Sequence, residues 1–524
     1  MSDLNRQEAA SIAGGHATAR VHHDVLRSAL IGPLRFLVPV AGYFILYPIL
    51  LEHAGLAVLG LWSVLSTLIT YVGMADIGFS QLITREAGQD RDKAALEKVR
   101  REYLTARRVY LFIAIVLLGG LAALGTRPFQ GLAEYYSAKA LWVSVGILII
   151  AATCQITARL DAAVLSARND NHGVQMVLVI TPAFPFAASV IGALTGFPIE
   201  GLSTGALLAA LAQLVIFRLR LRRRHGDWQT REASLTLRGS LVELPDLLRR
   251  GAHFYAISIG FILREPVFRL VIGLALGPAA IGVYDIAMRI TRTVREVAAA
   301  GFTALFPGFA VLLRATARDS AARLLRVSFQ TLMAVGGFGF LLLVLFAAPF
   351  YSFWLDGGPP GLGAVTRILI LGNLITLANV PFWYLLQASG NERLGAYALW
   401  VQTAAVLLLI PAVGFFHMTL PDMMIYWVLS EVLMLGMIFW FCETRLDLFL
   451  AALANKRTAM LCLLVVGFLG AAYWLTGYGA SSGALIWRGV LAGGFGLAIL
   501  PVIWSPLGDF IARARPVSGT KTGP

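Results

Sequence analysis

The chain has 524 residues, of which 58% are hydrophobic and only 14% are charged, with a mean hydropathy of +0.74. Soluble globular proteins carry about 25% charged residues, so the composition excludes an ordinary soluble domain and indicates a polytopic membrane protein. The net charge of +14 would suit nucleic acid, but the basic residues alternate between connections as they do in membrane proteins, and we expect no nucleic-acid partner.

The N-terminal segment is polar and lacks the apolar core of a cleaved signal peptide. We therefore expect residues 1–30 to form a cytoplasmic tail. The three cysteines, Cys154, Cys442 and Cys462, have no metal-ligand spacing and lie in or beside apolar segments. We expect them to be small core residues, and the sequence predicts no metal site and no cofactor.

Apolar stretches of about 20 residues are long enough to cross a bilayer as helices. The chain contains fourteen such stretches, several of them separated by tight turns such as Gly277-Pro278. They lie near 34–52, 57–80, 109–126, 140–158, 173–194, 201–217, 251–276, 281–310, 326–349, 364–388, 396–416, 423–441, 458–477 and 485–505. The expected fold class is an all-α polytopic membrane protein of about fourteen transmembrane helices.

The basic residues of the connections predict the orientation of these helices. Alternate connections hold 26 Lys and Arg residues, whereas the connections on the opposite face hold only Arg127 and Lys139. The basic connections are 81–108, 159–172, 218–250, 311–325, 389–395 and 442–457. The positive-inside rule places them, and both termini, on the cytoplasmic side, as expected for a multi-pass protein of a bacterial-type cytoplasmic (inner) membrane. They also provide attraction to anionic membrane lipids.

A short repeat predicts the domain organisation. Gly55, Gly60 and Trp62 recur as Gly277, Gly282 and Tyr284, each 222 residues later and each opening a span that runs inward. Two parallel six-helix repeats are therefore expected, which in transporters enclose a central cavity. The predicted domains are 31–217 for the first lobe, 218–250 for a basic connector, 251–441 for the second lobe, 442–505 for two additional helices and 506–524 for a cytoplasmic tail.

The eighth predicted span is unusual because it carries charges at membrane depth. Asp285, Arg289, Arg292 and Glu296 follow the spacing i, i+4, i+7, i+11 and share one helix face, with Arg295 beside them. Charged residues inside a membrane are costly and normally mark a substrate pathway. Arginine presents a planar fork of donors suited to phosphate oxygens, so the arginines are candidate ligands of an anionic headgroup.

The preceding span offers further candidates. Arg264 and Arg269 can face the same cavity, and Glu265 and Arg269 form an i, i+4 pair. The alternative interpretation is that the charges only pair with one another, as Asp285 with Arg289 and Arg292 with Glu296. That alternative leaves Arg295 without an acid four residues away.

Two isolated acids are candidates for ion coupling. Glu431 lies near the middle of the twelfth predicted span, and Asp76 lies toward the cytoplasmic end of the second. Carboxylates inside a membrane serve proton exchange in many transporters. The alternatives are a protonated Glu431 that hydrogen bonds to a neighbouring helix and an Asp76 that only forms a helix end.

Several motifs occur together in a fixed order. They are Tyr43-x3-Tyr47-Pro48, Gly55-x4-Gly60-Leu61-Trp62, Asp76–Phe79, Thr84–Ala87 and the stretch LVIGLALGPAAIGVYDIAMRI. In this the chain resembles the polysaccharide transporter branch of the multidrug/oligosaccharidyl-lipid/polysaccharide exporter superfamily over most of residues 30–445. The resemblance implies a flippase that moves a lipid-linked oligosaccharide to the outer leaflet, with a proton or sodium ion as coupling ion and a polysaccharide polymerase or glycosyltransferases as partners.

Three other functions were weighed against this one. A lipid II flippase of peptidoglycan synthesis also has fourteen spans and a cationic cavity. A multidrug or cation antiporter of the same superfamily is disfavoured by the excess of intramembrane arginines. A polymerising glycosyltransferase or ligase is disfavoured because no connection on the outer face is large, and the loops hold no catalytic constellation.

Overall fold

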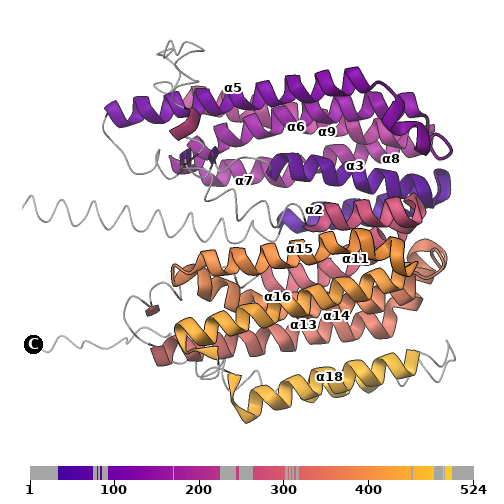
Figure 1. Cartoon of the computed structure of the whole chain (residues 1–524), viewed down its shortest axis with the longest axis vertical. Coiled ribbons are helices and arrows are strands. Elements are labelled where there is room, and N and C mark those ends of the chain that lie inside the picture. Colours follow the sequence, from indigo (N-terminus) through magenta and orange to yellow (C-terminus); the bar gives the residue numbers. More distant parts are fainter. Residues whose placement is uncertain are drawn as a thin grey trace, which may run out of the picture. The chain divides into compact units, whose positions relative to one another are not determined.

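The computed structural model describes residues 34–74, 93–168, 170–224, 264–300, 318–449, 453–476 and 490–498, with a few isolated stretches of one to three residues between them. The regular structure in these ranges is helical throughout. The chain divides into two compact units, residues 1–262 and 263–524, and each unit is a bundle of long helices (Figure 1).

The first unit contains seven long or medium helices and one short 3-10 helix in its described residues. They are α2 (Leu34–His53), α3 (Leu56–Met74), α5 (Lys93–Leu124), η1 (Arg127–Leu132), α6 (Ala138–Ala167), α7 (Asn171–Ile180), α8 (Ala183–Thr195) and α9 (Pro198–Arg224). Helix α6 packs along α9 and also contacts α3 and α5, whereas α8 packs between α9 and α2. A buried apolar cluster that includes Phe79, Tyr110 and Phe217 joins α5, α6 and α9 at one end of this unit.

Helix α9 begins in close contact with α8. The predicted fifth span, 173–194, is two helices in the structure, because Pro182 lacks the amide donor that would continue α7 into α8. A Cβ on Gly201 of α9 would lie 2.3 Å from the carbonyl oxygen of Ala188 in α8. Only glycine permits this approach, so Gly201 fixes how closely α8 and α9 pack.

The second unit begins with helical residues 264–276, which have apolar and charged faces. Its other helices are α11 (Pro278–Ala299), α13 (Arg318–Leu355), α14 (Leu362–Ala388), α15 (Glu392–Phe416), α16 (Leu420–Leu446) and α18 (Lys456–Thr476). Helix α14 is central, because it contacts α11, α13, α15 and α16. The unit is held by one large apolar core that includes Phe340, Leu377, Phe382 and Ile438.

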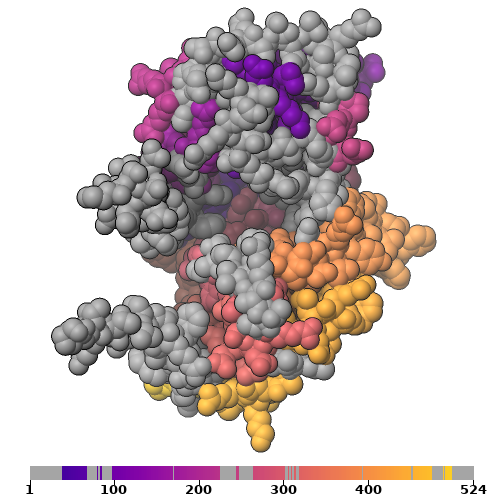
Figure 2. Space-filling view, turned by 90° about the vertical axis from the view of Figure 1, so that its left-hand side faces the viewer, coloured from indigo at the N-terminus to yellow at the C-terminus, as the bar shows by residue number. Residues whose placement is uncertain are grey.

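Helix α18 belongs to the second unit. It packs on α13, where Val465 of α18 and Phe495 of the following helical residues 490–498 lie against Gly337. Figures 1 and 2 show α18 at the outer surface of its unit. The two C-terminal helices predicted as an addition are thus joined, in their described parts, to the core of the second bundle.

Nine helices in the described part of the chain are long and apolar enough to cross a membrane. Helix α11 is not among them, although its 22 residues would extend roughly 33 Å at about 1.5 Å per residue. Its length therefore suits a crossing, and its composition does not, because of its five charged side chains. The all-α polytopic class is confirmed.

The predicted cytoplasmic connections are partly helical where the structure describes them. Residues 93–108 form the start of α5, residues 218–224 the end of α9, and residues 318–325 the start of α13. These segments are rich in Ala, Arg, Leu and Glu, which favour helix even beyond the apolar part. The interpretation of these stretches as loops was wrong, because charge marks where a helix leaves the membrane and does not mark where it ends.

The first glycine of the repeated motif has a positive φ in both units. Gly55 (φ +83°) precedes α3, and Gly277 (φ +82°) precedes α11. L-residues rarely adopt this φ, so glycine is required at both sites. Each glycine joins two helices as a tight antiparallel hairpin, and the aromatic residue seven positions later, Trp62 or Tyr284, is buried in its own unit.

Candidate functional site

The hairpin at Gly277 brings two buried charges together. Arg269 lies eight residues before Gly277 and Asp285 lies eight residues after it. Because both helices of the hairpin advance about 1.5 Å per residue, the two side chains lie at the same distance from the turn. Nη2 of Arg269 lies 2.8 Å from Oδ1 of Asp285, and both side chains are almost fully buried. Pairing offsets part of the cost of placing these charges at membrane depth.

Further ion pairs extend this contact along the hairpin. Glu265, one turn before Arg269, lies 3.1 Å from both Arg269 and Arg292. Arg292 also donates to Glu296 at 2.7 Å, and Arg289 lies 3.5 Å from Asp285. The expected pairs within α11 and between Glu265 and Arg269 are all present. The pairs that cross the hairpin were missed, although the Gly-Pro turn in the sequence was the signal for them.

Arg264 connects the hairpin to α15 and α16. Its Nη1 lies 3.0 Å from Oε1 of Glu431 and donates to Oε1 of Gln402 at 2.7 Å. Its guanidinium also lies 4.9 Å from the ring centroid of Trp427. Glu431 was interpreted as an isolated acid, and that interpretation was wrong, because helical residues 264–276 bring a cation to it that lies 167 residues away in sequence.

Arg295 differs from the other arginines of this group. Within the part of the chain that the structure describes, it has no carboxylate at ion-pair distance and no side-chain hydrogen bond. We call these charged residues of the hairpin, together with Glu431 of α16, the charged hairpin. It has five arginines (264, 269, 289, 292 and 295) and four acids (Glu265, Asp285, Glu296 and Glu431). The group therefore has one positive charge in excess, and Arg295 is the arginine without an acid at ion-pair distance among the described residues.

Exposure varies strongly along the charged hairpin. Arg269 and Asp285 expose 3% and 0% of their side chains, whereas Arg292 and Glu296 expose 36% and 32%. Arg295 is half-buried and lies three residues from Arg292, on the same side of α11. The inner pair can only support the structure, whereas the outer end of the group, Arg292 and Arg295, can meet a ligand.

The remaining predicted site residue, Asp76, lies outside the described residues. Asn373 of α14 is, from the sequence, a candidate for hydrogen bonding either to a sugar or to a neighbouring helix, and in the structure its amide donates to Thr291 of α11 at 3.1 Å. This contact holds α11 against the centre of the second bundle. The sequence signal for it is an amide in an otherwise apolar helix, which does not identify the partner.

The matching hairpin of the first unit carries no such charges. With the offset of 222 residues, Arg269 corresponds to Tyr47 and Asp285 to Ser63, both of them buried. Glu265 corresponds to Tyr43, whose ring lies 6.1 Å from that of Trp62. The same fold element is thus ionic in the second unit and aromatic in the first.

The fold is shared with solved transporters. A lipid II flippase, MurJ, in an inward closed conformation matches 91% of this chain and 99% of its own, with 12% identity and a TM-score of 0.61. An inward-facing multidrug resistance MATE family transporter of the MOP superfamily matches 80% and 98%, with 14% identity and a TM-score of 0.57. A MOP superfamily transporter from Pyrococcus furiosus, described as having a binding pocket of reverse polarity, matches 81% and 96%, with 15% identity and a TM-score of 0.55.

These identities show the fold alone. The search of curated proteins finds no significant match. A family model described as polysaccharide biosynthesis protein matches residues 50–328, which are more than half of the chain and include both Gly55 and Gly277. The chain therefore belongs to the polysaccharide biosynthesis protein family, and it shares its fold with the MATE and MurJ transporters.

Proposed function

We propose that this protein is a flippase that moves a polyprenyl-diphosphate-linked oligosaccharide across the cytoplasmic membrane by alternating access. The observation that carries the proposal is the excess cation of the charged hairpin, Arg295. A diphosphate is the anionic part of such a lipid, and a guanidinium can donate two parallel hydrogen bonds to phosphate oxygens. The family match supports a polysaccharide precursor as the cargo.

Arg292 can join Arg295 in binding the diphosphate. Arg292 already divides its donors between Glu265 and Glu296, so a diphosphate beside Arg295 can replace one carboxylate without leaving Arg292 unpaired. The inner pair, Arg269 and Asp285, stays intact and holds the hairpin. The proposed ligand contacts are therefore Arg295 and Arg292, with Arg264, Arg269 and Arg289 supporting them.

We further propose that Glu431 links transport to an ion gradient. Glu431 is buried and paired with Arg264. Binding of a proton to Glu431 would remove its attraction for Arg264 and so change which arginines are available to phosphate. Headgroup binding and protonation would then be thermodynamically linked, because each would change the affinity for the other.

A lipid II flippase remains the second candidate, because the match to MurJ covers 91% of the chain. Lipid II also carries a diphosphate, so the charged hairpin does not separate the two cargoes. An organic cation is a poor third candidate, since the described residues of the charged hairpin carry one positive charge in excess.

A transport assay in liposomes tests the proposal. The purified protein is reconstituted with a fluorescent polyprenyl-diphosphate oligosaccharide, with lipid II, or with a fluorescent organic cation, and the arrival of each at the opposite leaflet or lumen is timed. We expect rapid transfer of the first cargo. Faster transfer of lipid II would favour the second candidate, and transfer of the cation alone would contradict the proposal.

A further inference from the structure

A pocket in the first unit has a lining unlike that of the charged hairpin. Its volume is about 240 Å³, somewhat below the roughly 300–1,000 Å³ of pockets that hold drug-sized ligands. Helices α2, α3, α6, α8 and α9 line it, together with the break between α7 and α8. None of its described lining residues is acidic or basic, so the pocket is built for an uncharged group of limited size.

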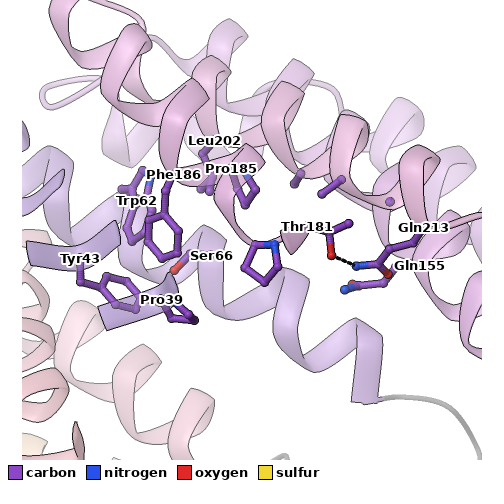
Figure 3. Close-up of a pocket in the computed structure, with 14 residues that line it drawn as sticks. Pro39, Tyr43, Trp62, Ser66, Gln155, Thr181, Pro185, Phe186, Leu202 and Gln213 are labelled. Carbon is purple, nitrogen blue, oxygen red and sulfur yellow. Dashed lines mark hydrogen bonds between the residues drawn. The ribbon is translucent and has the colours of Figure 1, made fainter. Parts of the chain in front are cut away.

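One end of the pocket is aromatic. Figure 3 shows Tyr43, Trp62 and Phe186 together at this end. Ring centroids of Tyr43 and Phe186 lie 4.7 Å apart with planes nearly perpendicular, at 83°. Trp62 is held in place because its Nε1 donates to Oγ of Ser189 at 2.9 Å. The end therefore offers rigid ring faces in more than one orientation, which suit the apolar C–H face of a ligand.

The opposite end of the pocket is polar (Figure 3). Nε2 of Gln213 donates to Oγ1 of Thr181 at 2.7 Å, and Thr181 in turn donates to the carbonyl of Val177. Gln155 lies beside them and lines the pocket. Its Oε1 is buried and accepts no hydrogen bond from the residues that the structure describes. Gln155, Thr181 and Gln213 thus give this end amide and hydroxyl groups, which suit the hydroxyl groups of a ligand.

We propose that this pocket binds one uncharged sugar ring of the cargo. A pyranose has an apolar face for the aromatic end and hydroxyl groups for Gln155 and its neighbours, and its size suits the volume. This inference rests on the proposed function, because the sugar is part of the cargo proposed there. It also gives a reason for Tyr43, the aromatic residue that stands in the first unit at the position of Glu265.

A binding measurement with matched lipids separates the two assignments. The probes are geranylgeranyl diphosphate and the same lipid bearing one glucose, galactose or N-acetylglucosamine, titrated against the purified full-length protein in detergent. We expect at least one sugar to increase the affinity. In Gln155→Leu this increase should shrink by about three- to tenfold, the loss of one hydrogen bond, whereas affinity for the bare diphosphate lipid should not change.

Two further variants show whether a loss in Gln155→Leu comes from the pocket or from misfolding. Ala206→Phe fills the pocket without removing a polar contact and should also abolish the gain from the sugar. Gln175→Leu, on α7 and outside the pocket lining, should keep it. The sugar site is overturned if no sugar strengthens binding to the native protein, or if Gln155→Leu and Ala206→Phe both retain the full gain. Failure of the bare diphosphate lipid to bind would instead contradict the proposed function.

Discussion

Arg269 and Asp285 lie at equal distances along the chain from Gly277, and their side chains meet at 2.8 Å in the interior of the second unit. This pair is the fixed end of the charged hairpin. Its partners become more exposed toward Arg292 and Glu296. A buried structural end and an accessible end allow one group of charges both to hold the helices and to meet a ligand.

Removal of either member of this pair should destabilise the protein strongly. Arg269→Met or Asp285→Leu removes the closest ion-pair partner of a buried charge, which then keeps only the contact of Asp285 with Arg289 or of Arg269 with Glu265. This loss costs up to about 3–5 kcal/mol. The double variant should cost less than the sum of the two single variants, because it removes both members of the pair. The midpoint of thermal unfolding in detergent measures this, with Arg323→Met on the exposed side of α13 as the control. Simple additivity of the two losses would show that the pair is not coupled.

The turn of the hairpin should tolerate no side chain. Gly277 has φ +82° and ψ 173°, and a Cβ at this position would meet no atom within 4 Å. Any loss in Gly277→Ala therefore comes from the backbone alone, at about 1–3 kcal/mol. Gly119→Ala, in the helical interior of α5 and equally unobstructed, should have the opposite sign and raise the unfolding midpoint. Equal midpoints for the two alanine variants would refute the requirement for glycine.

Neutralisation of Glu431 should uncouple transport from the gradient. Glu431→Gln keeps a hydrogen-bond acceptor for Arg264 but no longer exchanges a proton. We expect its transport rate in liposomes to be independent of an imposed pH difference, whereas the native protein and Asp319→Asn, an exposed acid at the start of α13, should respond to it. A Glu431→Gln protein that keeps the full response would exclude this residue as the coupling site.

The sequence predicts the general fold well because its strongest signals are local. Apolar length predicts most of the helices, and the spacing of Asp285, Arg289, Arg292 and Glu296 predicts the pairs within α11. The recurrence of Gly55 as Gly277 in the sequence corresponds to a positive φ at both glycines. These features depend on residues within a few turns of one another.

Contacts between distant segments could not be predicted in this way. The partner of Glu431 is Arg264, and the partner of Asn373 is Thr291, both chosen by how helices pack in the second unit. The pocket of the first unit escaped notice for the same reason, because Gln155, Thr181 and Gln213 come from three parts of the chain. At each of these positions a polar or charged residue in an apolar segment indicates a buried contact, but it does not identify the partner.

The central claim, that Arg295 meets the diphosphate, is tested most directly by comparing the binding of a polyprenyl diphosphate with that of the matching polyprenyl monophosphate. The native protein should prefer the diphosphate. In Arg295→Ala that preference should fall by about tenfold or more, the loss of a hydrogen bond to a charged group. Arg295→Lys should be intermediate because it keeps the charge and loses the fork, and Arg323→Ala should not differ from the native protein. An Arg295→Ala protein that keeps the native preference would contradict the account.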